Sequence, residues 1–140
     1  MKKAILLAGL ITFTFSLSSC GVIFGGSRYN ADIKVLDHPE AQIFANGEKI
    51  GVGEVTKSFK RNKELKIEVK QDGCEPKLQN FDNSFRTGNF ILSVITWGIP
   101  GIIVDLASGA SYKPDYKHNK SVEKVSTKDY KFNIDYSECK

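Results

Sequence analysis

"ELKIEVKQDG", residues 64–73, carries the most regular pattern in the chain and decides the fold class. Apolar and charged residues alternate along it, with Leu65, Ile67 and Val69 on one side and Lys66, Glu68 and Lys70 on the other. Alternation with a period of two is typical of a β-strand that has one buried face and one face in water. Asp72-Gly73 is a turn signal, so we expect the strand to end there.

The residues upstream repeat this pattern. Residues 31–37 and 53–61 alternate apolar and polar side chains, and residues 41–51 predict two strands joined by Asn46-Gly47, the strongest short hairpin signal. Lys60-Arg61-Asn62-Lys63 is interpreted as a solvated turn between two strands. Together these segments predict four or five short antiparallel strands, and hence a mainly β (α+β) fold built as a small sheet or sandwich.

Downstream, the same pattern returns only near the end of the chain. Four large apolar side chains alternate within DYKFNIDY, residues 129–136, which predicts a final strand that returns to the sheet and enlarges its core. Residues 74–87 are polar and irregular, with one further strand near Leu78 as an alternative for their first part. Residues 113–128 are rich in Lys and Ser and are interpreted as a loosely ordered polar arm.

FILSVITWGIPGIIVDL, residues 90–106, is the most apolar stretch of the second half and is interrupted by Gly98, Pro100 and Gly101. As one straight helix it would rise about 26 Å, just short of a hydrocarbon core about 30 Å thick, and Pro100 would break or kink it. Three alternatives remain: a single membrane span, a soluble core segment and a broken helical hairpin. The preferred one is a hairpin within residues 88–112 that packs on the domain or lies on the membrane surface.

This hairpin would consist of helices near residues 89–96 and 101–107. We assign its membrane or partner contacts to Trp97, Ile99, Ile102 and Ile103. A Trp at the corner suits an interface, because its ring is apolar while its N–H stays hydrated. Asp105, the one carboxylate of the segment, is interpreted as a cap or a partner of a nearby backbone group or Lys rather than as a catalytic acid.

The N-terminus has the pattern of a cleaved export signal. Lys2 and Lys3 precede an uncharged apolar stretch, residues 4–17, that is too short for a confident membrane span. Leu17-Ser18-Ser19-Cys20 then resembles the lipobox of bacterial lipoproteins. The resemblance implies cleavage before Cys20, a diacylglyceryl group on its thiol and an acyl chain such as palmitate on the new amine. Gly21 in place of Asp implies, by the same resemblance, the outer membrane, facing the periplasm.

The central segment resembles the PEGA domain, a small β module of bacterial envelope proteins. Pro39-Glu40-Ala41, Asn46-Gly47 and Asp72-Gly73 stand where that family has its turn motifs. Gly51-Val52-Gly53 replaces the family's Gly-Thr-Pro turn, and Cys74 replaces its usual aromatic residue. The resemblance implies a fold and an envelope location, and no shared enzymatic activity.

The likeness extends to the Gly-rich ending IIVDLASGASY, residues 102–112, which resembles segments that follow such a module in lipoproteins. The expected organisation is a signal peptide 1–19, a lipidated tether 20–30, a PEGA-like β domain 31–82, an apolar hairpin 88–112, a polar arm 113–128 and a C-terminal strand 129–140.

The remaining cysteines, Cys74 and Cys139, would lie in a compartment that permits disulfides, but sequence alone does not place them within bridging distance, so their pairing stays open. His38 and His118 are far apart and lack ligand spacing to a Cys or carboxylate pair, so no metal or cofactor is expected. No nucleophile elbow or phosphate loop occurs, so no catalytic residue is expected. The net charge of +4 is spread along the chain without a basic cluster with interleaved aromatics, so nucleic acid is not an expected partner.

Two non-enzymatic function classes remain. In the first, the chain is a membrane-anchored envelope lipoprotein that serves as a structural or interaction module and holds an envelope protein or the cell wall, for example at an exposed strand edge. In the second, it is a phage-encoded or defensive lipoprotein in which residues 88–112 engage the bilayer or a membrane partner.

Overall fold

The structure, a computed structural model, describes residues 26–139 and is mainly β. One four-stranded sheet has the order β4-β1-β10-β9, formed by β1 (Arg28–Val35), β4 (Glu54–Lys60), β9 (Val122–Lys124) and β10 (Asp129–Ile134). The other has the order β3-β2-β5-β6, formed by β2 (Gln42–Ala45), β3 (Glu48–Val52), β5 (Leu65–Lys70) and β6 (Lys77–Phe81). The short strands β7 (Asn83–Phe85) and β8 (Tyr112–Pro114) pair with each other and flank the helix α3 (Thr87–Ser108).

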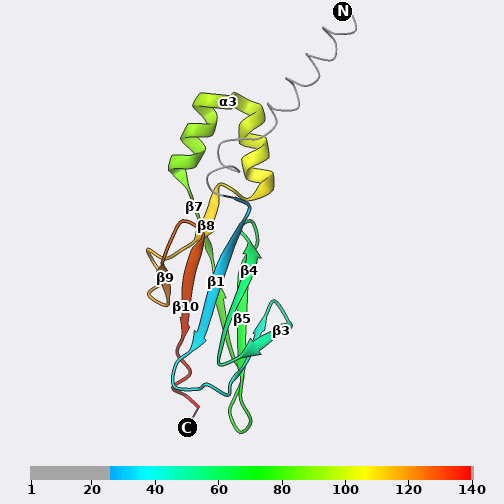
Figure 1. The fold of residues 1–140 in the computed structure, drawn as a ribbon, viewed down its shortest axis with the longest axis vertical. Coiled ribbons are helices and arrows are strands. Elements are labelled where there is room, and N and C mark those ends of the chain that lie inside the picture. The colour runs from blue at the N-terminus through cyan, green and yellow to red at the C-terminus, as the bar shows by residue number, and fades with distance from the viewer. Residues whose placement is uncertain (1–25, 140) are drawn as a thin grey trace, which may run out of the picture.

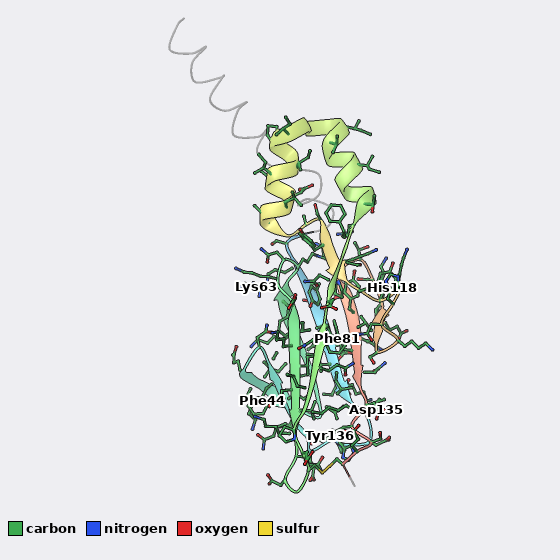
Figure 2. The ribbon with its side chains drawn as sticks, turned by 180° about the vertical axis from the view of Figure 1, so that it is seen from behind. Phe44, Lys63, Phe81, His118, Asp135 and Tyr136 are labelled. Atoms are coloured by element: carbon green, nitrogen blue, oxygen red, sulfur yellow. A yellow bond between two sulfur atoms is a disulfide. The ribbon has the colours of Figure 1, made fainter. Side chains whose placement is uncertain are left out.

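The core lies between the two four-stranded sheets and follows from the alternation in their strands. In β5, Leu65, Ile67 and Val69 are buried, as the sequence pattern predicts. The inward residues of β1 and β10 meet them from the opposite sheet. The rings of Phe81 and Phe132 pack edge to face with 5.0 Å between centroids and so join the two layers, and Figure 2 shows Phe81 in the middle of the sandwich.

The turn between β2 and β3 has the predicted geometry. Asn46 has φ 52° and Gly47 has φ 86°, the positive values that a type I′ turn requires at both central residues. The Asn46 side chain also accepts a hydrogen bond of 3.0 Å from the backbone N–H of Lys66 on β5. The turn therefore fixes the register of β2 against both of its neighbours.

The first strand is longer and differently paired than the sequence suggests. β1 begins at Arg28, inside the segment expected to be a tether, because Tyr29 is buried in the core. Its partner on one side is β10, which runs parallel to it with Asn30 opposite Asp129. The final strand thus does return to the sheet, but it lies beside the first strand and makes a parallel pair in an otherwise antiparallel fold.

The segment expected to be a loosely ordered arm, residues 113–128, contains regular structure. It includes the end of β8 and all of β9, which pairs with β10 through Val122 opposite Phe132. Val122 is buried, whereas the other two residues of β9, Glu123 and Lys124, are exposed. One buried residue among many charged ones leaves too little alternation to predict such a short strand.

Arg61 contradicts the expected solvated turn. It is the largest fully buried side chain among the described residues. Its Nε donates to the carbonyl of Arg28 at 3.2 Å, its Nη1 to that of Tyr112 at 3.3 Å and its Nη2 to that of Thr127 at 2.8 Å. The guanidinium therefore connects the start of β1, strand β8 and the loop before β10, because its planar fork can satisfy three carbonyls at once.

Candidate functional site

Helix α3 is a broken hairpin that stands beyond one end of the sandwich, opposite the C-terminus (Figure 1). The break is at Gly98, whose φ of 61° and ψ of −147° are not helical and suit a residue without a side chain. Pro100, which we expected to break the helix together with the glycines beside it, lies in the first turn of the second arm, where its missing N–H costs no helical hydrogen bond. The predicted helical hairpin is thus present, and its corner lies within the expected junction, residues 97–100.

The base of the hairpin is fixed to the sandwich through the turn that follows β4. The Asn62 side chain donates to the carbonyl of Ala107 at 3.4 Å, at the end of the second arm. Gly109, with φ 82°, caps that arm and lies so close to Asn62 that an added Cβ would overlap its backbone. Arg61, next to Asn62, binds the carbonyl of Tyr112. These contacts hold the hairpin at the end of the sandwich where β1 begins (Figure 1).

The outer surface of the hairpin is apolar. Among the side chains that the structure describes there, six large apolar ones are exposed: Ile91, Val94, Ile95, Ile99, Ile103 and Leu106. The most exposed are Ile95 at 76% and Ile99 at 74%. Asp105, the only charged residue in the sequence of α3, is fully buried. The hairpin therefore presents aliphatic side chains without a charge, which is unusual for a surface in contact with water alone.

The four residues assigned to membrane or partner contact are distributed along this hairpin. Ile99 and Ile103 are exposed, and Ile102 is half-buried. The side chain of Trp97 lies outside the described part of the structure, as does the whole of Cys20. Within residues 26–139, no helix has the length and hydropathy needed to cross a membrane.

At the opposite end of the molecule, a disulfide joins Cys74 to Cys139, with 5.2 Å between their Cα atoms. Cys74 follows β5 and Cys139 follows β10, so the bond links the two sheets. Beside it, the Tyr136 hydroxyl donates to the carbonyl of Glu75 at 2.7 Å. Figure 2 shows Tyr136 at the end far from α3. Sequence alone left this pairing open.

The two histidines lie apart in the structure. The His38 ring packs edge to face on Tyr136 at 5.3 Å, whereas the His118 Nδ1 lies 2.8 Å from a carboxylate oxygen of Asp115 on an exposed loop. The hydrogen bond from His118 lowers the pKa of Asp115. Among the described residues no group of three or more His, Cys, Asp or Glu side chains is arranged to hold a metal ion.

A basic pocket, which sequence reasoning missed, opens beneath the first arm of the hairpin. It has a volume of about 330 Å³ and is lined by the cationic side chains of Arg86, Lys113, Lys117 and Lys124, and the described residues of its wall include no carboxylate. Thr127 and Tyr130 form part of the remaining wall. These four cations come from the junction of β7 and α3, from β8, from β9 and from the loop between the last two, so no local sequence pattern connects them.

No protein-family model, curated protein or solved structure matches this chain. The likeness to the PEGA domain and to lipoproteins therefore stays a prediction.

Proposed function

We propose that this protein is a non-enzymatic module of the bacterial cell envelope, anchored through lipid on Cys20 and seated on the membrane by the α3 hairpin. The anchor and the hairpin together would hold the sandwich in one orientation at the membrane surface. We propose that this membrane is the outer membrane and that the sandwich faces the periplasm. The observation that carries the proposal is the uncharged aliphatic surface of α3, with Ile95 and Ile99 about three-quarters exposed.

The position of the hairpin relative to the proposed anchor supports this function. The described chain starts at Gly26, and β1 begins at the end of the sandwich that carries α3 (Figure 1). Residues 20–26 can span at most about 20–25 Å when extended. The lipid on Cys20 would therefore enter the membrane close to the hairpin, and both would contact the same leaflet.

The far end of the sandwich would then face away from the membrane and be accessible to an envelope protein or the cell wall. Strand β6 forms an edge of its sheet, and its Leu78 side chain is 62% exposed. An exposed edge strand can pair with an extended segment of another chain. This surface is our choice for a partner contact, in keeping with a module that links the membrane to another envelope component.

The proposed anchor is tested by mass spectrometry of the N-terminal peptide of the membrane-purified protein. We expect a peptide that begins at Cys20 and carries diacylglyceryl and acyl masses. A peptide that still begins at Met1, or an unmodified Cys20, would contradict lipid attachment.

The membrane seat of the hairpin is tested with a fluorescent probe in the full chain. In an Ile99→Cys variant the substituted residue would be the only reactive thiol, because Cys20 would carry lipid and Cys74 is bonded to Cys139. In the protein reconstituted into vesicles, a probe at position 99 should emit at a shorter wavelength than the same probe in water. It should be quenched by nitroxide attached to the lipids and not by iodide in the water.

The matched control is Val52→Cys, an exposed apolar residue of β3 on the body of the sandwich. Its probe should be quenched by iodide and spared by the lipid-borne quencher. If the probe at position 99 behaves like the one at position 52, the hairpin is not in the bilayer. If it is shielded in cell membranes but open to iodide in vesicles, a protein partner covers the hairpin.

A further inference from the structure

The cations of the basic pocket are not neutralised by nearby acids. Within residues 26–139, none of Arg86, Lys113, Lys117 and Lys124 forms an ion pair with a carboxylate. Asp115 is engaged by His118 and the backbone amides around it, and Asp129 accepts hydrogen bonds from Ser126 and Asn30. The pocket therefore keeps a concentration of positive charge, which attracts anions.

One aromatic ring contacts two of these cations. The Lys113 Nζ lies 5.0 Å from the centroid of the Tyr116 ring, and the Lys124 Nζ lies 5.7 Å from the same centroid. Tyr116 in turn packs on Tyr130, whose ring belongs to the core. Tyr116 thus fixes where two of the four cations lie before any ligand arrives.

Arg86 has a hydrogen-bond donor without an acceptor. Its Nη1 is buried and has no hydrogen-bond partner in the described part of the chain. Burial, and then the positive charge of Arg61, lower the pKa of Arg86. A buried guanidinium N–H without a partner is costly, and the oxygen of an anion would supply both an acceptor and the missing negative charge.

We propose that this pocket binds a phosphate group, supplied by an anionic phospholipid head group. A phosphate offers several oxygens, which suits one guanidinium and several ammonium groups. The lipid source rests on the proposed membrane seat of α3. Each arm of the hairpin holds about ten residues and rises about 15 Å, which equals half of a hydrocarbon core about 30 Å thick. With the corner at Gly98 buried in one leaflet, the pocket at the base lies level with the lipid phosphates.

The test is calorimetric titration of the detergent-solubilised full chain with three probes: dihexanoyl phosphatidylglycerol, dihexanoyl phosphatidylcholine and inorganic phosphate. Phosphatidylglycerol should bind at least about tenfold more tightly than phosphatidylcholine, because four cations repel the choline group. The double variant Lys113→Gln, Lys124→Gln should weaken phosphatidylglycerol binding at least about tenfold. The control Lys49→Gln, Lys66→Gln removes the same charge from exposed positions of the other sheet and should retain the original affinity.

The probes separate the two sources of phosphate. If phosphatidylglycerol binds and inorganic phosphate does not, the ligand is a lipid. If inorganic phosphate binds tightly, and this binding is lost in the Lys113/Lys124 variant only, the ligand is a soluble phosphate compound. Equal affinity for both lipids without phosphate binding, or equal losses in both variants, would overturn the proposal. The probe at position 99 tests independently whether the hairpin enters the bilayer. If that probe stays in water while phosphatidylglycerol still binds, the membrane seat is wrong; if the probe enters the bilayer while phosphatidylglycerol does not bind, the pocket proposal is wrong.

Discussion

Removal of the disulfide through Cys74→Ala and Cys139→Ala is expected to lower the free energy of unfolding by about 4 kcal/mol. The bond closes a loop across a sequence separation of 65 residues. In the chain-entropy model, a cross-link of that span lowers the entropy of the unfolded chain and so destabilises it by about 4 kcal/mol. Its position adds to the effect, because it joins the segment before β6 to the segment after β10 and so connects the two sheets.

Chemical denaturation of the oxidised, reduced and double-variant proteins measures this effect. Reduction of the original protein should lower its unfolding midpoint, in denaturant concentration, to that of the double variant. Reductant should leave the midpoint of the variant unchanged, and this controls for effects of the reagent. If oxidised and reduced proteins unfold at the same denaturant concentration, the two cysteines are not bonded in the folded protein.

Replacement of Arg61 with Met is expected to cost about 3–5 kcal/mol of folding free energy. The change would remove three part-buried hydrogen bonds, to the carbonyls of Arg28, Tyr112 and Thr127, and a hydrogen bond from a charged group contributes about 1.5–3 kcal/mol. Arg61→Lys keeps the charge but cannot reach three carbonyls with one ammonium group, so it should also be clearly less stable than the original protein.

The neighbouring exposed residue provides the control. Lys60→Met changes a similar side chain on the solvated end of β4 and should alter the stability by no more than about 0.5 kcal/mol. Equal, small losses at both positions in a denaturant titration would mean that Arg61 is solvated. A small loss for Arg61→Lys with a large one for Arg61→Met would mean that charge, rather than the three-way fork, matters.

The sequence pattern predicts the strands well where the signal is local. The alternation in residues 64–73 and 129–136 reports which face of a strand is buried, and both segments form strands with buried alternate residues. The Asn46-Gly47 turn and the broken apolar hairpin are local signals as well, and both are present. The corner of α3 lies at Gly98, within the expected junction of residues 97–100, although sequence does not decide which residue of that junction breaks the helix.

The features that the sequence does not reveal depend on contacts between residues that are far apart in the chain. Arg61 is buried because three carbonyls from separate elements surround it, although an Arg in a Lys-rich turn is ordinarily solvated. The pocket cations are distributed from Arg86 to Lys124 and meet only in the folded chain. The bond between Cys74 and Cys139 and the parallel pairing of β1 with β10 likewise depend on where the sheets place the two ends of the chain.

The pairing of β1 with β10 has a consequence for the order in which the molecule folds. Asn30 and Asp129 are hydrogen-bonded across a sequence separation of 99 residues, so one side of the first strand is completed only by the last. Contacts of such long range give a high contact order, which is associated with slow folding. A chain that emerges from its N-terminus onward cannot complete this sheet until residues 129–134 are available, and until then one hydrogen-bonding edge of β1 remains unpaired.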